Sequence, residues 1–310
     1  MEGKYKGKRG YGLLYFEKIA ILGVGLMGAS FARAVRKLGV TSRICGYGRN
    51  EESLIRAKKD GIIDCYDTTL SSLADGADLI LLATPAGTFE TLATQISPYL
   101  MQGAIVTDVG SVKGSLVYTL EELMPEGVHF VGAHPIAGKD QSGMSASSDC
   151  LYNNALCIVT PTGKTDRPSL ETVKTLWKLI GCSIKTLTPE KHDEIFSSIS
   201  HLPHIVAYAM VNTIAGIDNG FFEYAGKGFK DTTRIAGSSP DIWSDICLLN
   251  KENITNHIGI YIEKLNAILT HIKNSNKDGL LKEFDNARAL RNDIKTDVSN
   301  TGIEDCIDNV

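Results

Sequence analysis

The first part of the chain alternates short apolar runs with segments of helical spacing. The apolar runs are four to six residues long, are bounded by turn residues and cover residues 19–22, 43–47, 78–83, 104–108 and 129–133. Such runs are typical of strands buried on both faces of a parallel sheet. Helix signals lie between them, such as Asn50 as an N-cap ahead of residues 51–59 and Gly61 behind them. This alternation predicts an α/β Rossmann-type fold with a doubly wound parallel sheet.

The pattern changes near residue 189. A final strand–helix–strand unit is expected at residues 155–159, 169–180 and 183–187. Helical spacing then covers residues 189–217, 242–272 and 278–298. We therefore predict an α/β domain over residues 17–188 and an all-α C-terminal domain over residues 189–310. Helical domains that follow a Rossmann-type domain often associate, so a homodimer through this domain is expected by analogy.

Residues 1–16 carry four basic side chains followed by a short apolar piece at residues 13–16. That piece is shorter than the hydrophobic region of a secretory signal, and no small-residue cleavage site follows it. We expect a flexible leader rather than a targeting signal.

Composition narrows the class of protein. A net charge of −4 and a pI near 6.0 give no reason to expect nucleic acid or an anionic membrane as a partner. No apolar run approaches the roughly 20 residues that span a bilayer. The seven cysteines are scattered and include no C-x-x-C pair. They predict reduced thiols in a cytoplasmic protein rather than a disulfide framework or a zinc site.

A glycine-rich turn follows the first apolar run. Gly23, Gly25 and Gly28 have G-x-G-x-x-G spacing, and a helical pattern begins at Leu26 and Met27. The first glycine permits a tight turn, the second lets the backbone approach a pyrophosphate, and the third lets helix and strand pack closely. The helix N-terminus adds unpaired N–H groups that favour phosphate. These five residues predict a dinucleotide site.

Polar residues follow several of the other predicted strands. Ligands of doubly wound sheets bind outside the carboxyl ends of the strands, and this edge is predicted to carry Thr84, Pro85, Asp108, Ser111 and His134. Thr84 and Pro85 would contact the cofactor. Pro135 holds His134 in extended backbone, and a neutral imidazole suits a base for a substrate hydroxyl.

Each of these residues also has a structural interpretation. Ser111 is a favoured helix cap, and Lys113 would then be a solvated charge. His134 could be a packing histidine.

The helical part contains a polar cluster within apolar sequence, formed by His192, Asp193, Ser200, His201 and His204. Pro203 disturbs the helical spacing of the last two histidines and no H-E-x-x-H motif is present, so we predict no metal site. Two interpretations stay open, namely a satisfied structural network and polar groups that line a cleft. Arg234 could pair with a protein carboxylate or bind a substrate carboxylate through its guanidinium fork.

Together these motifs resemble those of the prephenate/arogenate dehydrogenase family of tyrosine biosynthesis, over about residues 17–275. The resemblance rests on the glycine motif and on Asp108-Val-Gly-Ser111-Val-Lys113, Gly132-Ala-His134-Pro-Ile-Ala-Gly138 with Ser142-Gly143, His192-Asp193, Ser200-His-Leu-Pro-His204 and Gly228-Phe-Lys-Asp-Thr-Thr-Arg234. It implies oxidative decarboxylation of prephenate to 4-hydroxyphenylpyruvate, or of arogenate to tyrosine, with hydride transfer to NAD(P)⁺.

The resemblance also implies roles for individual residues. His134 matches the catalytic histidine that accepts a hydrogen bond from the ring hydroxyl, and Ser111 matches a serine beside the hydroxyl and the nicotinamide. Arg234 matches the arginine that binds a substrate carboxylate. Ser200 and His204 match cleft residues, and Asp193 matches an acid in an ionic network near them.

The sequence departs from the family pattern in three ways. Asp140 stands where the family often carries Glu, which leaves a gating role there in doubt. No chorismate mutase segment and no regulatory module are recognised, which resembles the stand-alone form. Gly48, Arg49 and Asn50 stand where NAD-selective folds carry an acid for the ribose 2′-hydroxyl. Because that acid is missing and Arg49 can bind a 2′-phosphate, we predict NADP in preference to NAD.

Two alternatives differ in function. A β-hydroxyacid dehydrogenase shares the glycine motif, but its glycine-flanked catalytic lysine has no match here. A non-catalytic NADP-binding sensor would bind cofactor without turnover, which His134, Ser111 and Arg234 together argue against.

Overall fold

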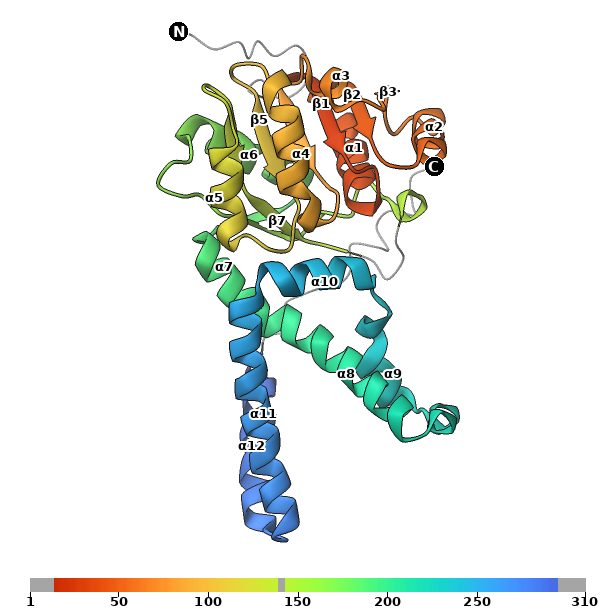
Figure 1. Ribbon diagram of the computed structural model, residues 1–310, viewed down its shortest axis with the longest axis vertical. Coiled ribbons are helices and arrows are strands. Elements are labelled where there is room, and N and C mark those ends of the chain that lie inside the picture. The colour runs from red at the N-terminus through yellow and green to blue at the C-terminus, as the bar shows by residue number, and fades with distance from the viewer. Residues whose placement is uncertain (1–13, 139–142, 295–310) are drawn as a thin grey trace. The chain divides into compact units, whose positions relative to one another are not determined.

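The computed structural model describes residues 14–138 and 143–294, and the chain divides into two compact units (Figure 1). Of the described residues, the first unit contains those up to Phe196 together with Gly237–Asn250. The second contains Ser197–Ala236 and the described residues from Lys251 to Ile294.

The first unit is built on a six-stranded parallel sheet in the order β3-β2-β1-β4-β5-β6. The strands are β1 (Phe16–Leu22), β2 (Thr41–Tyr47), β3 (Cys65–Tyr66), β4 (Leu79–Leu82), β5 (Ile105–Asp108) and β6 (His129–Val131). The strand order reverses between β1 and β4, which creates the crevice where doubly wound sheets bind ligands. The predicted fold class is confirmed, although the two-residue strand β3 was not expected.

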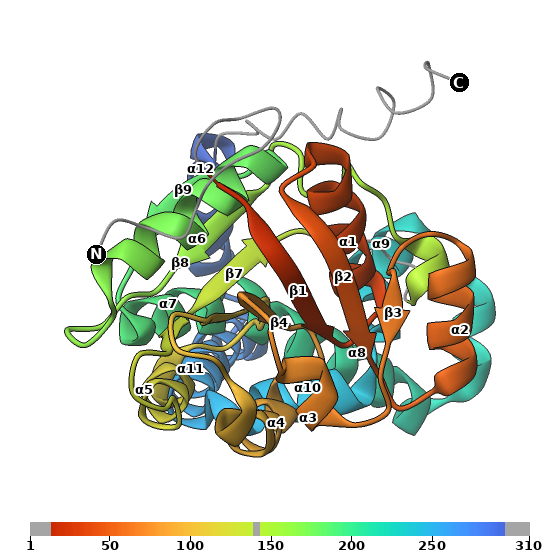
Figure 2. The ribbon, with the colours of Figure 1, turned by 90° about the horizontal axis from the view of Figure 1, so that it is seen from above.

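Helices cover both faces of this sheet because the strands are apolar on both sides (Figure 2). Ile19 and Ile21 of β1 pack in one core with α1 (Leu26–Leu38), α2 (Glu51–Lys59) and α6 (Arg167–Ile180). Ala20 and Leu22 pack in a second core with α3 (Leu70–Ala74), α4 (Phe89–Ile96) and α5 (Gly114–Glu122). Alternate residues of one strand thus serve opposite layers.

A second sheet has three strands, β7 (Ala133–Ile136), β8 (Leu156–Val159) and β9 (Ser183–Thr186). β7 is antiparallel to β8, and β8 is parallel to β9. The expected strand–helix–strand unit therefore exists, but its strands form a sheet of their own. His134 was predicted to follow a strand, but it lies within β7, opposite Ile158. The chain leaves the main sheet at Gly132, where a Cβ would lie 2.6 Å from Thr160 Oγ1.

The boundaries of the units differ from the predicted ones. Leu14 and Phe16 are buried in the first core, so the last residues of the predicted leader belong to the fold; residues 1–13 lie outside the described part. α7 (Pro189–Phe196) packs against α5, and α10 (Pro240–Leu249) packs against the short 3₁₀ turn η1 (Ala86–Thr88). Both helices therefore belong to the first unit, beyond the expected limit at residue 188.

The second unit is helical, as predicted. A π-helical turn (Ser197–His201) leads into α8 (Leu202–Ile217), so the expected helix over residues 189–217 is interrupted before Pro203. α9 (Lys227–Thr233), α11 (Lys251–Lys273) and α12 (Lys277–Asp293) follow. The remaining 3₁₀ turns within the described residues are η2 (Ser97–Tyr99), η3 (Met144–Ala146), η5 (Asn219–Tyr224) and η6 (Arg234–Gly237). None of the helices in the described residues combines the length and apolar character needed to cross a membrane.

The cysteines depart from the expectation of reduced thiols. Cys45 of β2 and Cys65 of β3 are direct partners in the parallel register, and the structure joins them in a disulfide. The pairing depends on strand register, which a separation of 20 residues does not reveal. Cys157 and Cys182 are buried free thiols, and burial raises the pKa of Cys182 to about 12.

Candidate active site

A cleft of about 750 Å³ opens at the carboxyl ends of β1, β2 and β4, entirely within the first unit. Seven of the ten residues predicted to bind cofactor line it, namely Gly23, Gly25, Gly48, Arg49, Asn50, Thr84 and Pro85. Leu26, Met27 and Gly28 do not line this cleft but form the first turn of α1 directly behind the glycines. The strand register explains why these residues lie at one cleft, because Leu22 of β1 pairs with both Tyr47 of β2 and Leu82 of β4.

The glycine turn has the geometry of a phosphate cradle. Gly23 has a φ of +101°, and a Cβ there would lie 2.6 Å from the carbonyl of Ala83. A Cβ at Gly28 would overlap the carbonyl oxygen of Gly23, whereas a Cβ at Gly25 would meet no atom of the chain within 4 Å. The first and third glycines are therefore required by packing, and the second leaves space for a ligand. The residues fit a dinucleotide, whose pyrophosphate would lie at the N-terminus of α1.

The β2 side of the cleft carries the residues linked to cofactor choice. Asn50 accepts a hydrogen bond from Ser53 N and caps α2, as predicted, while Arg49 is exposed. A Cβ at Gly48 would make an ordinary 3.6 Å contact with Leu54. A larger side chain therefore fits at Gly48, and steric exclusion does not explain the missing acid.

Sequence reasoning missed a wall of the cleft that α10 supplies. Ser239, Asp241, Ile242 and Asp245 line the cleft, and the Asp245 carboxylate accepts a hydrogen bond from Gly87 N at 3.1 Å. The residues are far from the glycine motif in sequence. The one available signal was a helix start at Pro240 with two acids four residues apart, which is also common on solvated helices.

Beside this cleft, a buried ion pair fixes the loop after β5. Asp108 pairs with Lys113, and each side chain is 1% exposed. The Asp108 carboxylate also accepts hydrogen bonds from Gly110 N at 2.8 Å and Ala133 N at 3.0 Å. Burial raises the pKa of the Asp108 carboxyl, and the Lys113 ammonium opposes that shift. Lys113 is thus a buried side chain and not a solvated charge, and its ammonium neutralises the Asp108 carboxylate.

This ion pair connects the two residues predicted to act in catalysis. Ser111 lies in the loop that Lys113 closes through its bonds to the carbonyls of Gly110 and Val112. Ala133, which Asp108 binds, immediately precedes His134. The residue that caps the N-terminus of α5 is Lys113 and not Ser111, and its backbone N–H donates a hydrogen bond to Asp193 Oδ1 at 2.8 Å.

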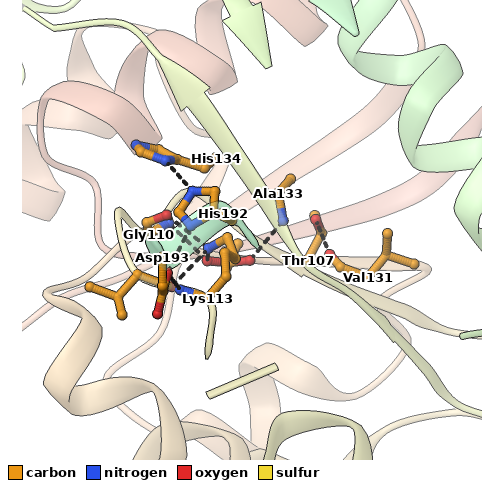
Figure 3. A network of polar contacts seen from close by, with 10 residues as sticks. Thr107, Gly110, Lys113, Val131, Ala133, His134, His192 and Asp193 are labelled. Carbon is orange, nitrogen blue, oxygen red and sulfur yellow. Dashed lines mark hydrogen bonds and ion pairs between the residues drawn. The ribbon is translucent and has the colours of Figure 1, made fainter. Parts of the chain in front are cut away.

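A chain of buried hydrogen bonds runs from His134 to α7 (Figure 3). His134 Nδ1 lies 2.8 Å from His192 Nε2, and His192 Nδ1 lies 2.8 Å from Asp193 Oδ1. His134 is 8% exposed and His192 is fully buried. The ring of Phe196 stacks on that of His192 with 4.5 Å between ring centroids, and its centroid lies 4.9 Å from that of the His134 ring. The cluster in α7 is therefore a hydrogen-bonded network joined to His134, and His192 was not among the predicted site residues.

The other predicted substrate residues belong to the second unit. His204 Nδ1 lies 2.9 Å from the carbonyl oxygen of Ser200. Burial lowers the pKa of His204, and the positive charge of Arg234 lowers it further, against the effect of the Ser200 carbonyl. Arg234 thus lies close enough to His204 to act on it electrostatically. Asp140 and Ser142 lie outside the described residues.

Two family models cover most of the chain. The model "Prephenate dehydrogenase, nucleotide-binding domain" matches residues 31–186, and "Prephenate dehydrogenase, dimerization domain" matches residues 188–286. The prephenate dehydrogenase of Bacillus subtilis is 34% identical over 279 residues, which are 89% of this chain and 75% of that protein.

Solved structures give the same result. Prephenate dehydrogenase of Aquifex aeolicus in complex with hydroxyphenyl propionate and NAD⁺ is 40% identical, with a TM-score of 0.85 over 91% of this chain and 99% of that one. Synechocystis arogenate dehydrogenase is 30% identical, with a TM-score of 0.75 over 89% and 99%. These matches confirm the resemblance over both the α/β and the helical parts. The chain therefore belongs to the prephenate dehydrogenase family and is an enzyme that uses a pyridine nucleotide.

Proposed function

We propose that this enzyme converts prephenate or arogenate by oxidative decarboxylation, with NADP preferred to NAD, and that His134 is the base. The observation that carries the proposal is the nearly buried His134 in β7, three residues beyond the carboxyl end of β6, which belongs to the sheet that bears the nucleotide cleft. A neutral imidazole in that position suits proton transfer near neutral pH.

The chemistry divides between the cofactor and the chain. A bound nicotinamide would supply the acceptor for a hydride from the ring carbon that bears the hydroxyl. Loss of that hydride makes the hydroxyl proton acidic, and His134 accepts it. The bond to the ring carboxylate breaks, its electron pair enters the ring, CO2 leaves, and the proton returns to the phenolic oxygen. Because aromatisation drives the reaction, the protein mainly orients the substrate and moves this proton.

Other residues would orient the substrate. Ser111, held by the buried Asp108–Lys113 pair, would contact the hydroxyl and the nicotinamide side. Arg234 would bind a carboxylate through its guanidinium fork, with His204 and Ser200 lining the substrate site. Asp193 is 2% exposed and holds His192 and the N-terminus of α5, which favours a supporting role over direct substrate contact.

The preference for NADP rests on Gly48 and the exposed Arg49. The Aquifex aeolicus relative was crystallised with NAD⁺, so the opposite preference is a real alternative. The second unit would form a homodimer, consistent with the family description of its matched region as a dimerization domain.

One assay tests the proposal. Purified enzyme is mixed with prephenate or arogenate and with NAD⁺ or NADP⁺, and reduced nicotinamide is followed spectrophotometrically. We expect turnover of one or both substrates with a higher kcat/KM for NADP⁺. No turnover in any of the four combinations would contradict the proposed reaction, and a higher kcat/KM for NAD⁺ would contradict only the cofactor preference.

A further inference from the structure

We propose that His192 is a positioning residue that holds the proton of His134 on Nδ1, so that Nε2 of His134 is the basic atom. The inference rests on the proposed role of His134 as the base. It follows from the order of donors and acceptors in the buried chain from Asp193 to His134 (Figure 3).

The order begins at Asp193. Its Oδ1 accepts the backbone N–H of Lys113, and it lies at the N-terminus of α5. Helix N-termini stabilise negative charge, and an ionised carboxylate can only accept hydrogen bonds. A Cβ at Gly114 would lie against this carboxylate, so glycine at this position leaves room for Asp193 at the N-terminus of the helix. His192 must therefore donate from Nδ1 to Asp193.

The remaining protons follow from that first bond. A neutral imidazole with its proton on Nδ1 has its lone pair on Nε2. His192 Nε2 therefore accepts, and His134 donates to it from Nδ1 across 2.8 Å. A neutral His134 then has its lone pair on Nε2, which makes that nitrogen the proton acceptor.

Packing prevents the rings from reversing this order. His192 is fully buried and stacks on Phe196 with an interplanar angle of 28°. Phe196 also contacts His134 at 4.9 Å, so both rings share one apolar neighbour. Rotating either ring would break a buried hydrogen bond, which costs free energy because buried polar groups need partners. The opposite tautomer of His134 would carry N–H on Nε2, which could not accept a proton from the substrate.

Two variants of His192 separate positioning from packing. His192→Leu removes the acceptor, whereas His192→Gln keeps an acceptor oxygen near the position of Nε2. We expect the Leu variant to lose about 10²-fold or more in kcat, the range of general-base catalysis, with cofactor affinity unchanged. The Gln variant should recover about tenfold or more of that loss. His271→Gln, on α11 in the other unit, is the matched control and should keep full activity.

A spectroscopic measurement tests the tautomer without any substitution of His192. Enzyme with ¹⁵N-labelled histidine is examined by long-range ¹H–¹⁵N correlation near neutral pH, with the His134 signals assigned by their loss in His134→Gln. We expect the native His134 to be protonated on Nδ1 only, and the Leu variant to lose this uniformity.

The outcomes are decisive in each direction. An Nε2–H tautomer of His134 in the native enzyme would overturn the inference, as would equal losses of kcat in the Leu and Gln variants. Because the tautomer is read from the enzyme without substrate, the inference and the proposed reaction can fail separately.

Discussion

At the residue scale, His134 has a role that can be tested by a single substitution. It lies just beyond the carboxyl end of β6 and takes part in a buried hydrogen bond. Replacing it with Ala should lower kcat by about 10² to 10⁴-fold, because general-base catalysis contributes roughly that factor. The affinity for the nucleotide should not change, since His134 does not line the cleft.

The measurement is steady-state kinetics combined with fluorescence titration of the cofactor. His129→Ala provides the control, because His129 lies at the start of β6, at the end of that strand opposite to the one that leads to His134. If His134→Ala kept most of the native kcat, its assignment as the base would be wrong.

Gly48 governs the predicted cofactor preference. Gly48→Asp adds a carboxylate where the structure offers an ordinary 3.6 Å contact and no steric conflict. A carboxylate accepts hydrogen bonds from the ribose hydroxyls of NAD and repels the 2′-phosphate of NADP. The ratio of kcat/KM for NADP to that for NAD should fall by about tenfold or more, which corresponds to about 1.4 kcal/mol.

Arg49→Gln is the companion variant for this prediction. It should weaken the binding of NADP without strengthening the binding of NAD. The substitution removes the attraction of the guanidinium for the 2′-phosphate and adds no hydrogen bond to the ribose. An unchanged cofactor ratio in Gly48→Asp would show that another part of the cleft selects the nucleotide.

Sequence alone predicted residues whose role depends on local spacing, and it missed those whose role depends on a distant partner. The glycine motif was predictable because turn, helix start and strand are contiguous in the chain. A solvated charge stayed open as an interpretation of Lys113, because its burial depends on Asp108 and on the start of β7. His192 was mentioned only as a neighbour of Asp193, because its hydrogen bond to His134 spans 58 residues.

At the element scale, the Asp108–Lys113 pair ties the loop after β5 to the first residue of β7. Lys113→Met should lower the free energy of unfolding by about 3 to 5 kcal/mol, because it leaves a carboxylate buried without its cation. Urea denaturation measures the change. The control is Lys164→Met. Lys164 pairs with Glu122 at 3.4 Å and both side chains are exposed, so this substitution should lower the free energy of unfolding by less than about 1 kcal/mol. Equal costs for the two variants would contradict the buried-pair argument.

Sheet topology shows why some elements were assigned wrongly. The apolar run at residues 129–133 and the strands near 155–187 were expected in one α/β domain, with no prediction of how they pair. In the structure β6 ends at Val131, and β7 begins a second sheet two residues later. Apolar periodicity identifies a buried strand but not its partner. The break depends on Asp108 binding Ala133 N, which is a contact between distant elements.

At the scale of the whole molecule, the first unit is discontinuous in sequence. The chain leaves it after Phe196 and returns as Gly237–Asn250, which supplies one wall of the nucleotide cleft. A single boundary at residue 188 could not describe this arrangement. The pattern of apolar residues shows only where the strands stop. The assignment of α10 to the first unit depends on the hydrogen bond from Gly87 N to Asp245 and on the packing of α10 against η1.

The second unit carries the last prediction, which concerns assembly. On α11 the side chains of Ile262, Leu265, Leu269 and Ile272 are each 45–58% exposed. Their spacing of three, four and three residues makes one apolar stripe along the helix, the pattern by which helices pack against a partner. An exposed stripe of this kind marks an association surface.

We therefore expect a dimer of the 33.6 kDa chain in light scattering. Leu265→Asp/Leu269→Asp should shift the enzyme toward monomer, lower its Tm and make that Tm less dependent on protein concentration, because a monomer is not stabilised by association. Lys264→Asp, a neighbouring exposed position off the stripe, should leave the dimer intact. If the native chain is monomeric at micromolar concentration, or if both variants dissociate equally, the stripe is not the interface. If the stripe variant dissociates and also loses turnover while its nucleotide affinity stays native, assembly is required for the substrate site, because the nucleotide cleft lies wholly within the first unit.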